Sequence, residues 1–203
     1  MPAKHVVDIT ILNCGGLADL MSEMEASFLV SALALFRNAP DFKKGEPRAK
    51  VTLARVYKPR DFHRMAYRPA DILHVIGHAK GDELQAGIAE RRITAAELGM
   101  QAEKAHGRLP PVVVSTGCKL QSSAWQQGMK AAGAEILIAS ANDVSPASLT
   151  AFDMAFYSAL LVQVRKNTEF LDRVTASFKL ANEYYRAIHA EGTPRATFSL
   201  ERL

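Results

Sequence analysis

Two runs of apolar residues constrain the fold of this chain more than any other feature. The first extends from Asp71 to His78 (DILHVIGH), and the second from Pro111 to Cys118 (PVVVSTGC). Runs rich in Val and Ile, in which polar residues do not alternate with apolar ones, are typical of strands that are buried on both faces. Such strands belong to parallel sheets, so we expect a sheet of this kind at the centre of the protein.

Strand patterns alternate with helical patterns along the whole chain. Strands are predicted over residues 6–12, 50–57, 71–78, 111–118 and 135–140, with a short edge strand over 196–200. Helices are predicted over residues 18–37, 59–65, 94–106, 122–132, 147–165 and 169–188. This alternation predicts one α/β domain over residues 1–203, a three-layer α/β/α sandwich with a mostly parallel sheet and right-handed crossovers.

Local signals support the boundaries of several predicted helices. Thr94 and Glu97 have the spacing of a capping box at the start of a helix. Ser145 and Pro146 form a typical start for the helix that follows them. The helix over 18–37 carries apolar residues at helical spacing, namely Leu20, Met24, Phe28, Leu29, Leu33 and Phe36.

Composition excludes several functional classes. The 203 residues are 48% hydrophobic and carry a mild net charge of +4 that is spread along the chain, which argues against nucleic acid as the main partner. With two cysteines the chain cannot build a disulfide scaffold, and no apolar stretch is long enough to span a membrane. The N-terminus leads directly into a strand pattern without a signal peptide. We therefore expect a cytoplasmic protein with both thiols reduced and no membrane contact.

The two apolar strands each end in a reactive side chain, His78 and Cys118. Active sites of parallel sheets lie beyond the carboxyl ends of the strands, so both side chains are expected at one edge. A Cys–His pair is the minimum equipment for thiolate nucleophilic catalysis. A helix predicted to begin soon after Cys118 would favour the thiolate through its dipole. The alternative is that Cys118 only packs in the interior, as free cysteines often do.

The other histidine and cysteine of this region are interpreted as structural. His74 lies inside the predicted strand, on the same face as Ile76, and is expected to be a hydrogen-bonded core residue. A metal pair of His74 and His78 would require a helix here, and no third ligand lies nearby in the sequence. Cys14 precedes Gly15 in a predicted turn at the end of the first strand. We therefore expect no metal and no cofactor.

The order of the two reactive residues excludes some cysteine enzymes. In class I glutaminases and in papain-like enzymes the cysteine precedes the histidine, whereas here His78 precedes Cys118. Thioredoxin-like proteins require a Cys-x-x-Cys motif, which this chain lacks. The arrangement therefore points to another class of cysteine enzyme.

Four sequence features in this order resemble the caspase-like cysteine peptidases (clan CD), and among them the CHAT-domain type. They are the strand-to-histidine segment 72–79, the strand-to-cysteine segment 113–118, the helix with Gly-Ala before a strand at 129–140, and Asp143 followed by the Phe-Tyr helix at 155–161. The resemblance covers about residues 68–190 and implies a caspase-like fold.

The resemblance also implies a function, the hydrolysis of peptide bonds in protein or peptide substrates. Cys118 would be the nucleophile and His78 the general acid–base partner. The backbone N–H groups of Ala79 and Cys118 would form the oxyanion hole. Small bacterial proteins of this type often work beside sensor or effector proteins, so a regulatory partner is expected. Pairing through the edge strand 196–200 would give a homodimer.

The chain departs from the family pattern after the histidine, where Ala79 stands in place of a glycine. If this position requires a positive φ, alanine is strained there and the oxyanion hole suffers. The alternative function is therefore a catalytically weak or inactive module that binds other proteins. An amidohydrolase or acyltransferase that uses the same dyad is a third interpretation. Lys119 and Leu120, after the cysteine, also differ from the common pattern.

By analogy with the family, a substrate pocket is expected at the ends of the first, fourth and fifth strands. Its residues would be Asn13, Ser115, Thr116 and Asp143. Asp143 is the acid among them, and it would either select an Arg or Lys side chain or cap the helix that begins near Ser145.

Overall fold

The computed structural model describes residues 6–15, 19–36, 48–87, 91–116, 119–163, 169–188 and 197–203. At its centre lies a six-stranded sheet in the order β2–β1–β3–β7–β8–β9. Its strands are β1 (Val7–Asn13), β2 (Ala49–Arg55), β3 (Ile72–Ile76), β7 (Val112–Ser115), β8 (Ile136–Ser140) and β9 (Phe198–Arg202). The first five are parallel, and β9 pairs antiparallel with β8 at the edge. The mostly parallel sheet is therefore confirmed.

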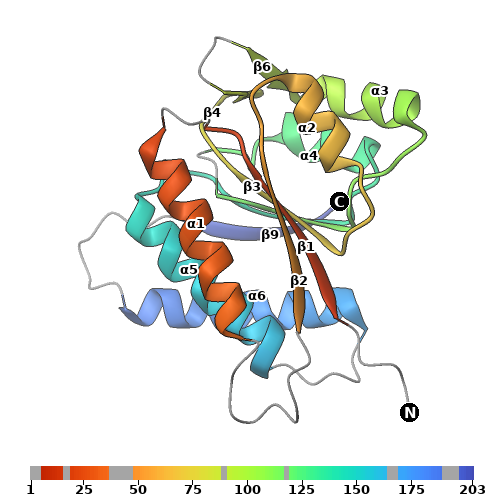
Figure 1. Ribbon diagram of the computed structural model, residues 1–203. Helices are drawn as coiled ribbons and strands as arrows, with labels where there is room; N and C mark the ends of the chain where they lie inside the picture. The colour runs from red at the N-terminus through yellow and green to blue at the C-terminus, as the bar shows by residue number, and fades with distance from the viewer. Residues whose placement is uncertain are drawn as a thin grey trace.

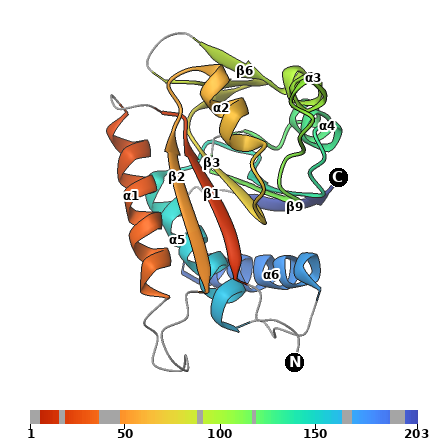
Figure 2. The ribbon, with the colours of Figure 1, turned by 45° about the vertical axis from the view of Figure 1, so that its right-hand side comes forward.

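Helices cover both faces of this sheet (Figures 1 and 2). One face is covered by α1 (Leu20–Leu35), α5 (Pro146–Ser158) and α6 (Phe170–Ile188). The other face is covered by α2 (Pro59–Ala66), α3 (Ala95–Ala105) and α4 (Ser123–Ala131). A π-helical turn, Ala159–Gln163, continues α5. The predicted three layers are confirmed, and no helix of the described segments is both long and apolar enough to cross a membrane.

Strand β3 shows why its sequence is apolar without interruption. Its side chains alternate between the two faces, as in any strand, and both faces are covered by helices. Ile72 and Ile76 pack in the core beneath α1, α5 and α6, whereas Leu73 and Val75 pack in the core beneath α2, α3 and α4. His74 is also fully buried, as the sequence predicted.

Helix α1 differs from the expectation based on its apolar spacing. Leu29 and Leu33 are buried, but Leu20, Met24 and Phe28 are 67%, 57% and 45% exposed. The buried side of the first two turns consists instead of small and polar residues, Ser22, Glu25 and Ala26. The N-terminal half of α1 thus turns a carboxylate toward the sheet and its large apolar side chains outward.

A second, smaller sheet was not predicted. It consists of β4 (Ala79–Lys80), β5 (Glu83–Gln85) and β6 (Arg92–Thr94), which pair antiparallel above the carboxyl edge of the main sheet (Figure 1). These strands have two or three residues each, too few to produce a recognisable alternation. The capping box of Thr94 and Glu97, which starts α3 directly after β6, is confirmed.

Candidate active site

His78 leaves the main sheet at the carboxyl end of β3. The preceding Gly77 has φ +156°, and a Cβ atom there would lie 2.9 Å from Cβ of Cys14. A larger residue would therefore collide with the end of β1, which makes glycine necessary at this close approach. Beyond it, the imidazole of His78 is 60% exposed, as the sequence predicted. Cys14 is buried as a free thiol, and burial raises its pKa, so its structural role is confirmed.

Asp19, which the sequence analysis did not identify, lies beside His78. Its Oδ2 is 2.7 Å from His78 Nε2. The same residue caps α1, because its Oδ1 accepts hydrogen bonds from the backbone N–H groups of Met21 and Ser22. Burial alone would raise the pKa of Asp19, but the hydrogen bonds from Ser22 and the interaction with His78 lower it below its ordinary value. Asp19 is thus an ionised partner that holds one ring nitrogen of His78.

Cys118 and the preceding Gly117 lie outside the described residues, but the strand that leads to them is described. In the pairing of β3 with β7, Val75 lies opposite Ser115. His78 and Cys118 each come three residues later in the sequence. The N–H of Thr116 donates a hydrogen bond of 3.1 Å to the carbonyl of Val75, so the segment that follows β7 is still hydrogen-bonded to β3 at this point.

Ala79 begins strand β4 and lies opposite Leu84. Among the described residues, positive φ angles outside glycine occur at His106 and Lys119 and not at Ala79. The N–H of Gln85 donates to the carbonyl of His78, so Ala79 and Leu84 form a non-hydrogen-bonded pair of the antiparallel ladder. The N–H of Ala79 therefore points away from β5. The strain expected if this position needed a positive φ does not arise.

Three of the four residues expected in a substrate pocket have buried side chains. Asn13, Ser115 and Thr116 are 0%, 1% and 3% exposed. Asn13 Nδ2 donates to Glu23 at 2.8 Å, and Thr116 Oγ1 lies 3.4 Å from the carbonyl of Val75. These residues form the floor of the carboxyl edge and do not line an open pocket in this structure.

Asp143 is the exposed member of that set, and it pairs with Lys119. The carboxylate lies 3.0 Å from the Lys119 ammonium, and its side chain is 75% exposed. The cap of α5 is Ser145, whose hydroxyl accepts a hydrogen bond from the N–H of Ser148. The interpretation of Asp143 as a helix cap is therefore wrong.

Charged side chains also surround Asn13. Glu23, on the first turn of α1, accepts hydrogen bonds from Asn13 and from the guanidinium of Arg55 at the end of β2. The bonds from Arg55 lower the pKa of Glu23, although partial burial opposes this. The start of α1 is thereby tied to the carboxyl ends of both β1 and β2, next to the Asp19 that holds His78.

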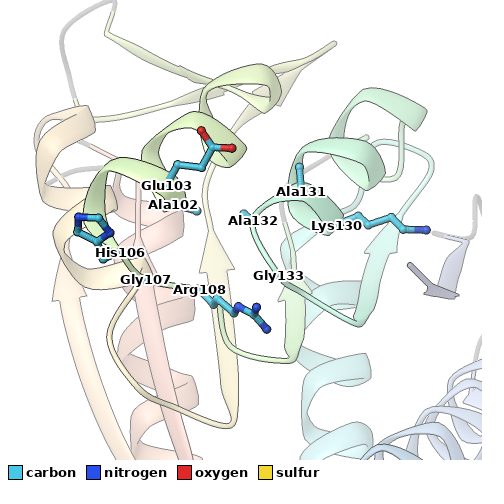
Figure 3. A pocket seen from close by; sticks show the side chains of 9 residues that line it. All are labelled: Ala102, Glu103, His106, Gly107, Arg108, Lys130, Ala131, Ala132 and Gly133. Atoms are coloured by element: carbon cyan, nitrogen blue, oxygen red, sulfur yellow. The ribbon is translucent and has the colours of Figure 1, made fainter.

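A pocket formed by the described residues lies elsewhere. It has a volume of about 510 Å³ and is lined by the C-terminal ends of α3 and α4 and by the loops that lead into β7 and β8 (Figure 3). These loops belong to the amino edge of the sheet, opposite to His78. The cavity therefore takes no part in the candidate active site.

Comparisons with known proteins identify the fold. No model of a protein family matches the chain, and no curated protein matches it. The similar solved structures include a secreted C11 cysteine protease from Bacteroides thetaiotaomicron with an irreversible peptide inhibitor (TM-score 0.63), an inactive zymogen C11 protease from Parabacteroides distasonis (0.58), and the Arg-specific cysteine proteinase gingipain R (0.50).

These similarities extend over nearly the whole chain at 10% sequence identity each. They cover 96%, 100% and 91% of this chain, in the same order, but only 65%, 63% and 44% of the other chains. This chain thus spans about two thirds of the length of the two C11 proteases. The caspase-like cysteine protease fold, expected from the sequence, is confirmed, whereas none of these structures bears on the CHAT-domain type.

Proposed function

We propose that this protein is a cysteine endopeptidase in which Cys118 and His78 form the catalytic dyad. The observation that carries this proposal is the placement of His78. Its imidazole is exposed at the carboxyl edge of the sheet and is fixed by Asp19. His78 follows β3, and β3 pairs with β7, the strand that leads to Cys118. The likeness to C11 and gingipain proteases supports the same chemistry on the same fold.

The orientation of the imidazole suggests which ring nitrogen of His78 takes part in the reaction. Asp19 occupies Nε2 of His78, so Nδ1 is the ring nitrogen left for the reaction. In the acylation step the Cys118 thiolate attacks the scissile carbonyl carbon and forms a C–S bond. His78 then donates its proton to the leaving amine as the C–N bond breaks, and water hydrolyses the resulting thioester.

The developing oxyanion needs two hydrogen-bond donors. We assign these to the backbone N–H groups of Ala79 and Cys118. Ala79 suits this role because its N–H points away from β5 and its backbone is unstrained. One such donor typically contributes about 10²–10³-fold to the rate. An unstrained Ala79 removes one of the reasons for considering an inactive binding module; the departures at Lys119 and Leu120 stand, and the labelling experiment below decides between the two functions.

Asp143 supports a preference for basic side chains before the scissile bond. It is an exposed carboxylate at the carboxyl edge, and its present partner is the flexible Lys119 ammonium. A substrate guanidinium could replace that ammonium and bind the carboxylate in a bidentate way. One of the similar proteases is Arg specific. Asn13, Ser115 and Thr116 would form the floor of this subsite.

Four finer assignments also remain proposals. The CHAT-domain type rests on the motifs that surround His78 and Cys118 in the sequence. A cytoplasmic location with reduced thiols accords with the small number of cysteines, and a regulatory protein partner is proposed from the sequence resemblance. Within the described part of the chain, the antiparallel strand β9 is an edge of the sheet and has no strand on its outer side, which would allow a homodimer.

The test uses peptidyl acyloxymethyl ketones that differ only in the side chain next to the warhead: Arg, Lys, Asp or Leu. We expect the wild type to be labelled fastest by the Arg and Lys probes and Cys118→Ala not to be labelled. If the wild type is labelled no faster than Cys118→Ala, the peptidase proposal fails. Mass spectrometry of a peptide library gives the second readout, because only a peptidase produces two new termini. An acyltransferase or an amidohydrolase would not.

A further inference from the structure

Three ionisable side chains meet inside the protein, away from the exposed His78. They are Glu25 of α1, His74 of β3 and Asp153 of α5. One donor atom of each, the imidazole nitrogen and two carboxylate oxygens, lies within 4.8 Å of the others. The cluster sits where α1 and α5 pack on the sheet, in the core that also contains Ile72, Ile76 and Phe156. Such a group is costly in an apolar interior unless something compensates it.

The polar atoms of this cluster have too few partners. Glu25 Oε1, His74 Nε2 and both carboxylate oxygens of Asp153 are buried without a hydrogen-bond partner among the described residues. Glu25, His74 and Asp153 are 9%, 0% and 2% exposed, so bulk water cannot satisfy them. Buried polar side chains in native proteins nearly always have partners, and an exception calls for an explanation such as an ion.

The separation of one pair of donor atoms in the cluster fits an ion between them. His74 Nε2 and Asp153 Oδ2 are 3.6 Å apart, too far for a hydrogen bond. Ligand atoms about 2.0–2.2 Å from a tetrahedral zinc ion are about 3.4 Å from each other. The observed 3.6 Å between His74 Nε2 and Asp153 Oδ2 is therefore close to the distance between two ligand atoms of a tetrahedral zinc ion.

Charge and ring orientation fit the same occupant. Two carboxylates carry a charge of −2, which a divalent cation neutralises within the core. Nδ1 of His74 lies 2.8 Å from the hydroxyl oxygen of Tyr157. When Nδ1–H donates to this oxygen, Nε2 presents its lone pair to the carboxylates, and an outer hydrogen bond of this kind is typical of metal-bound histidine.

We propose that Glu25, His74 and Asp153 supply three ligands to one divalent first-row cation, best zinc, which stabilises the fold. Ca²⁺ and Mg²⁺ prefer six or more oxygen ligands and suit one imidazole and two carboxylates poorly. The ion would join α1, whose N-cap is Asp19, to β3, which leads to His78. The inference does not depend on the proposed peptidase activity.

The first experiment measures metal content in tag-free, full-length protein by inductively coupled plasma mass spectrometry. The double variant His78→Ala/Cys118→Ala serves as the parent, because His78 and Cys118 could themselves bind zinc. We expect about one equivalent of a divalent cation in this parent. Glu25→Gln and Asp153→Asn, which preserve side-chain shape, are expected to lose it. Asp172→Asn, at an exposed carboxylate that pairs with Arg202, is the matched control and should retain it.

The second experiment removes the ion by unfolding the parent with a chelator, followed by refolding. Zinc at 100 times its dissociation constant is expected to raise Tm by about 5 °C or more, and cobalt should give the visible spectrum of a tetrahedral site. The proposal is overturned if the parent carries no cation and zinc leaves Tm unchanged. It is equally overturned if Glu25→Gln and Asp153→Asn hold as much metal as the parent. In either case the carboxyl groups of Glu25 and Asp153 would be neutralised by protons and not by a cation.

Discussion

Asp19 performs two tasks at the scale of a single residue. It caps α1 through Oδ1 and holds His78 through Oδ2. The first task is local and could have been inferred from an acidic residue before a helical pattern. The second joins residues that are 59 positions apart in the sequence, so no local pattern could reveal it.

Replacing Asp19 by Asn separates these two tasks. Asn is as good an N-cap as Asp, so we expect the thermal stability to remain close to that of the wild type. The imidazole of His78 loses its ionic partner, and a misplacement of about 1 Å can cost about 10²-fold in rate. We expect kcat with a peptide substrate to fall by about this factor while KM changes little.

The control for this prediction is Asp19→Ser, which also keeps an N-cap but cannot reach His78 as a carboxylate does. It should match Asp19→Asn in both stability and kcat. An undiminished kcat in both variants would show that Asp19 does not position the catalytic imidazole.

Helix α1 shows, at the scale of an element, how a helical pattern can mislead. Its apolar residues recur at helical spacing, yet Leu20, Met24 and Phe28 are exposed while Leu29 and Leu33 are buried. The spacing predicts that a helix forms. It does not decide which face is buried, because Leu20, Met24 and Phe28 lie along one side of the helix and Leu29 and Leu33 along a neighbouring side. The tertiary contacts with β3 and α5 choose the face that carries Glu25.

Adjacent residues on α1 provide a direct test of that choice. Leu29→Ala removes a fully buried side chain and should lower the free energy of unfolding by about 2–5 kcal/mol. Phe28→Ala removes a larger side chain that is 45% exposed and should cost only about 0.5 kcal/mol. Urea denaturation of both variants measures the difference. Equal losses would mean that the buried face of α1 has been assigned incorrectly.

The buried cluster concerns the whole molecule, because it joins residues from α1, β3 and α5. Burial raises the pKa of Glu25 to about 7; a hydrogen bond from Thr116 opposes this shift, and the charge of Asp19 adds to it. Burial and the charge of Glu25 raise the pKa of Asp153, whereas burial lowers the pKa of His74 to about 3. Without an ion, the folded protein thus favours the neutral form of all three groups.

The pH dependence of stability follows from the raised pKa of Glu25. In the unfolded chain its pKa is near the ordinary value of 4.5, so the folded state holds the proton more tightly. The stability that this proton provides is fully present below about pH 4.5 and is lost as the pH rises through about 7. Gln imitates the protonated acid and avoids this loss.

We therefore expect Glu25→Gln, with a chelator present, to gain stability over the wild type as the pH rises from 4.5 to 7. The gain should be on the order of 1–3 kcal/mol and constant above that range. Chemical denaturation of both proteins at a series of pH values measures it. If the difference in unfolding free energy between Glu25→Gln and the wild type did not vary with pH, the pKa of Glu25 would not be raised by folding. The carboxyl group would then be in contact with water.

The sequence by itself determined the layers of the fold and the two strands that lead to His78 and Cys118. Both follow from local patterns, because apolar runs and helix caps depend on neighbours in the chain. Tertiary structure decided the rest: the small sheet of β4, β5 and β6, the pairing of Asp19 with His78, and the meeting of Glu25 and Asp153 around His74. These contacts join residues 59, 49 and 79 positions apart, in the order Asp19–His78, Glu25–His74 and His74–Asp153. Only the packing of helices on the sheet brings such residues together, so the chain carried no local signal for a third ligand beside His74.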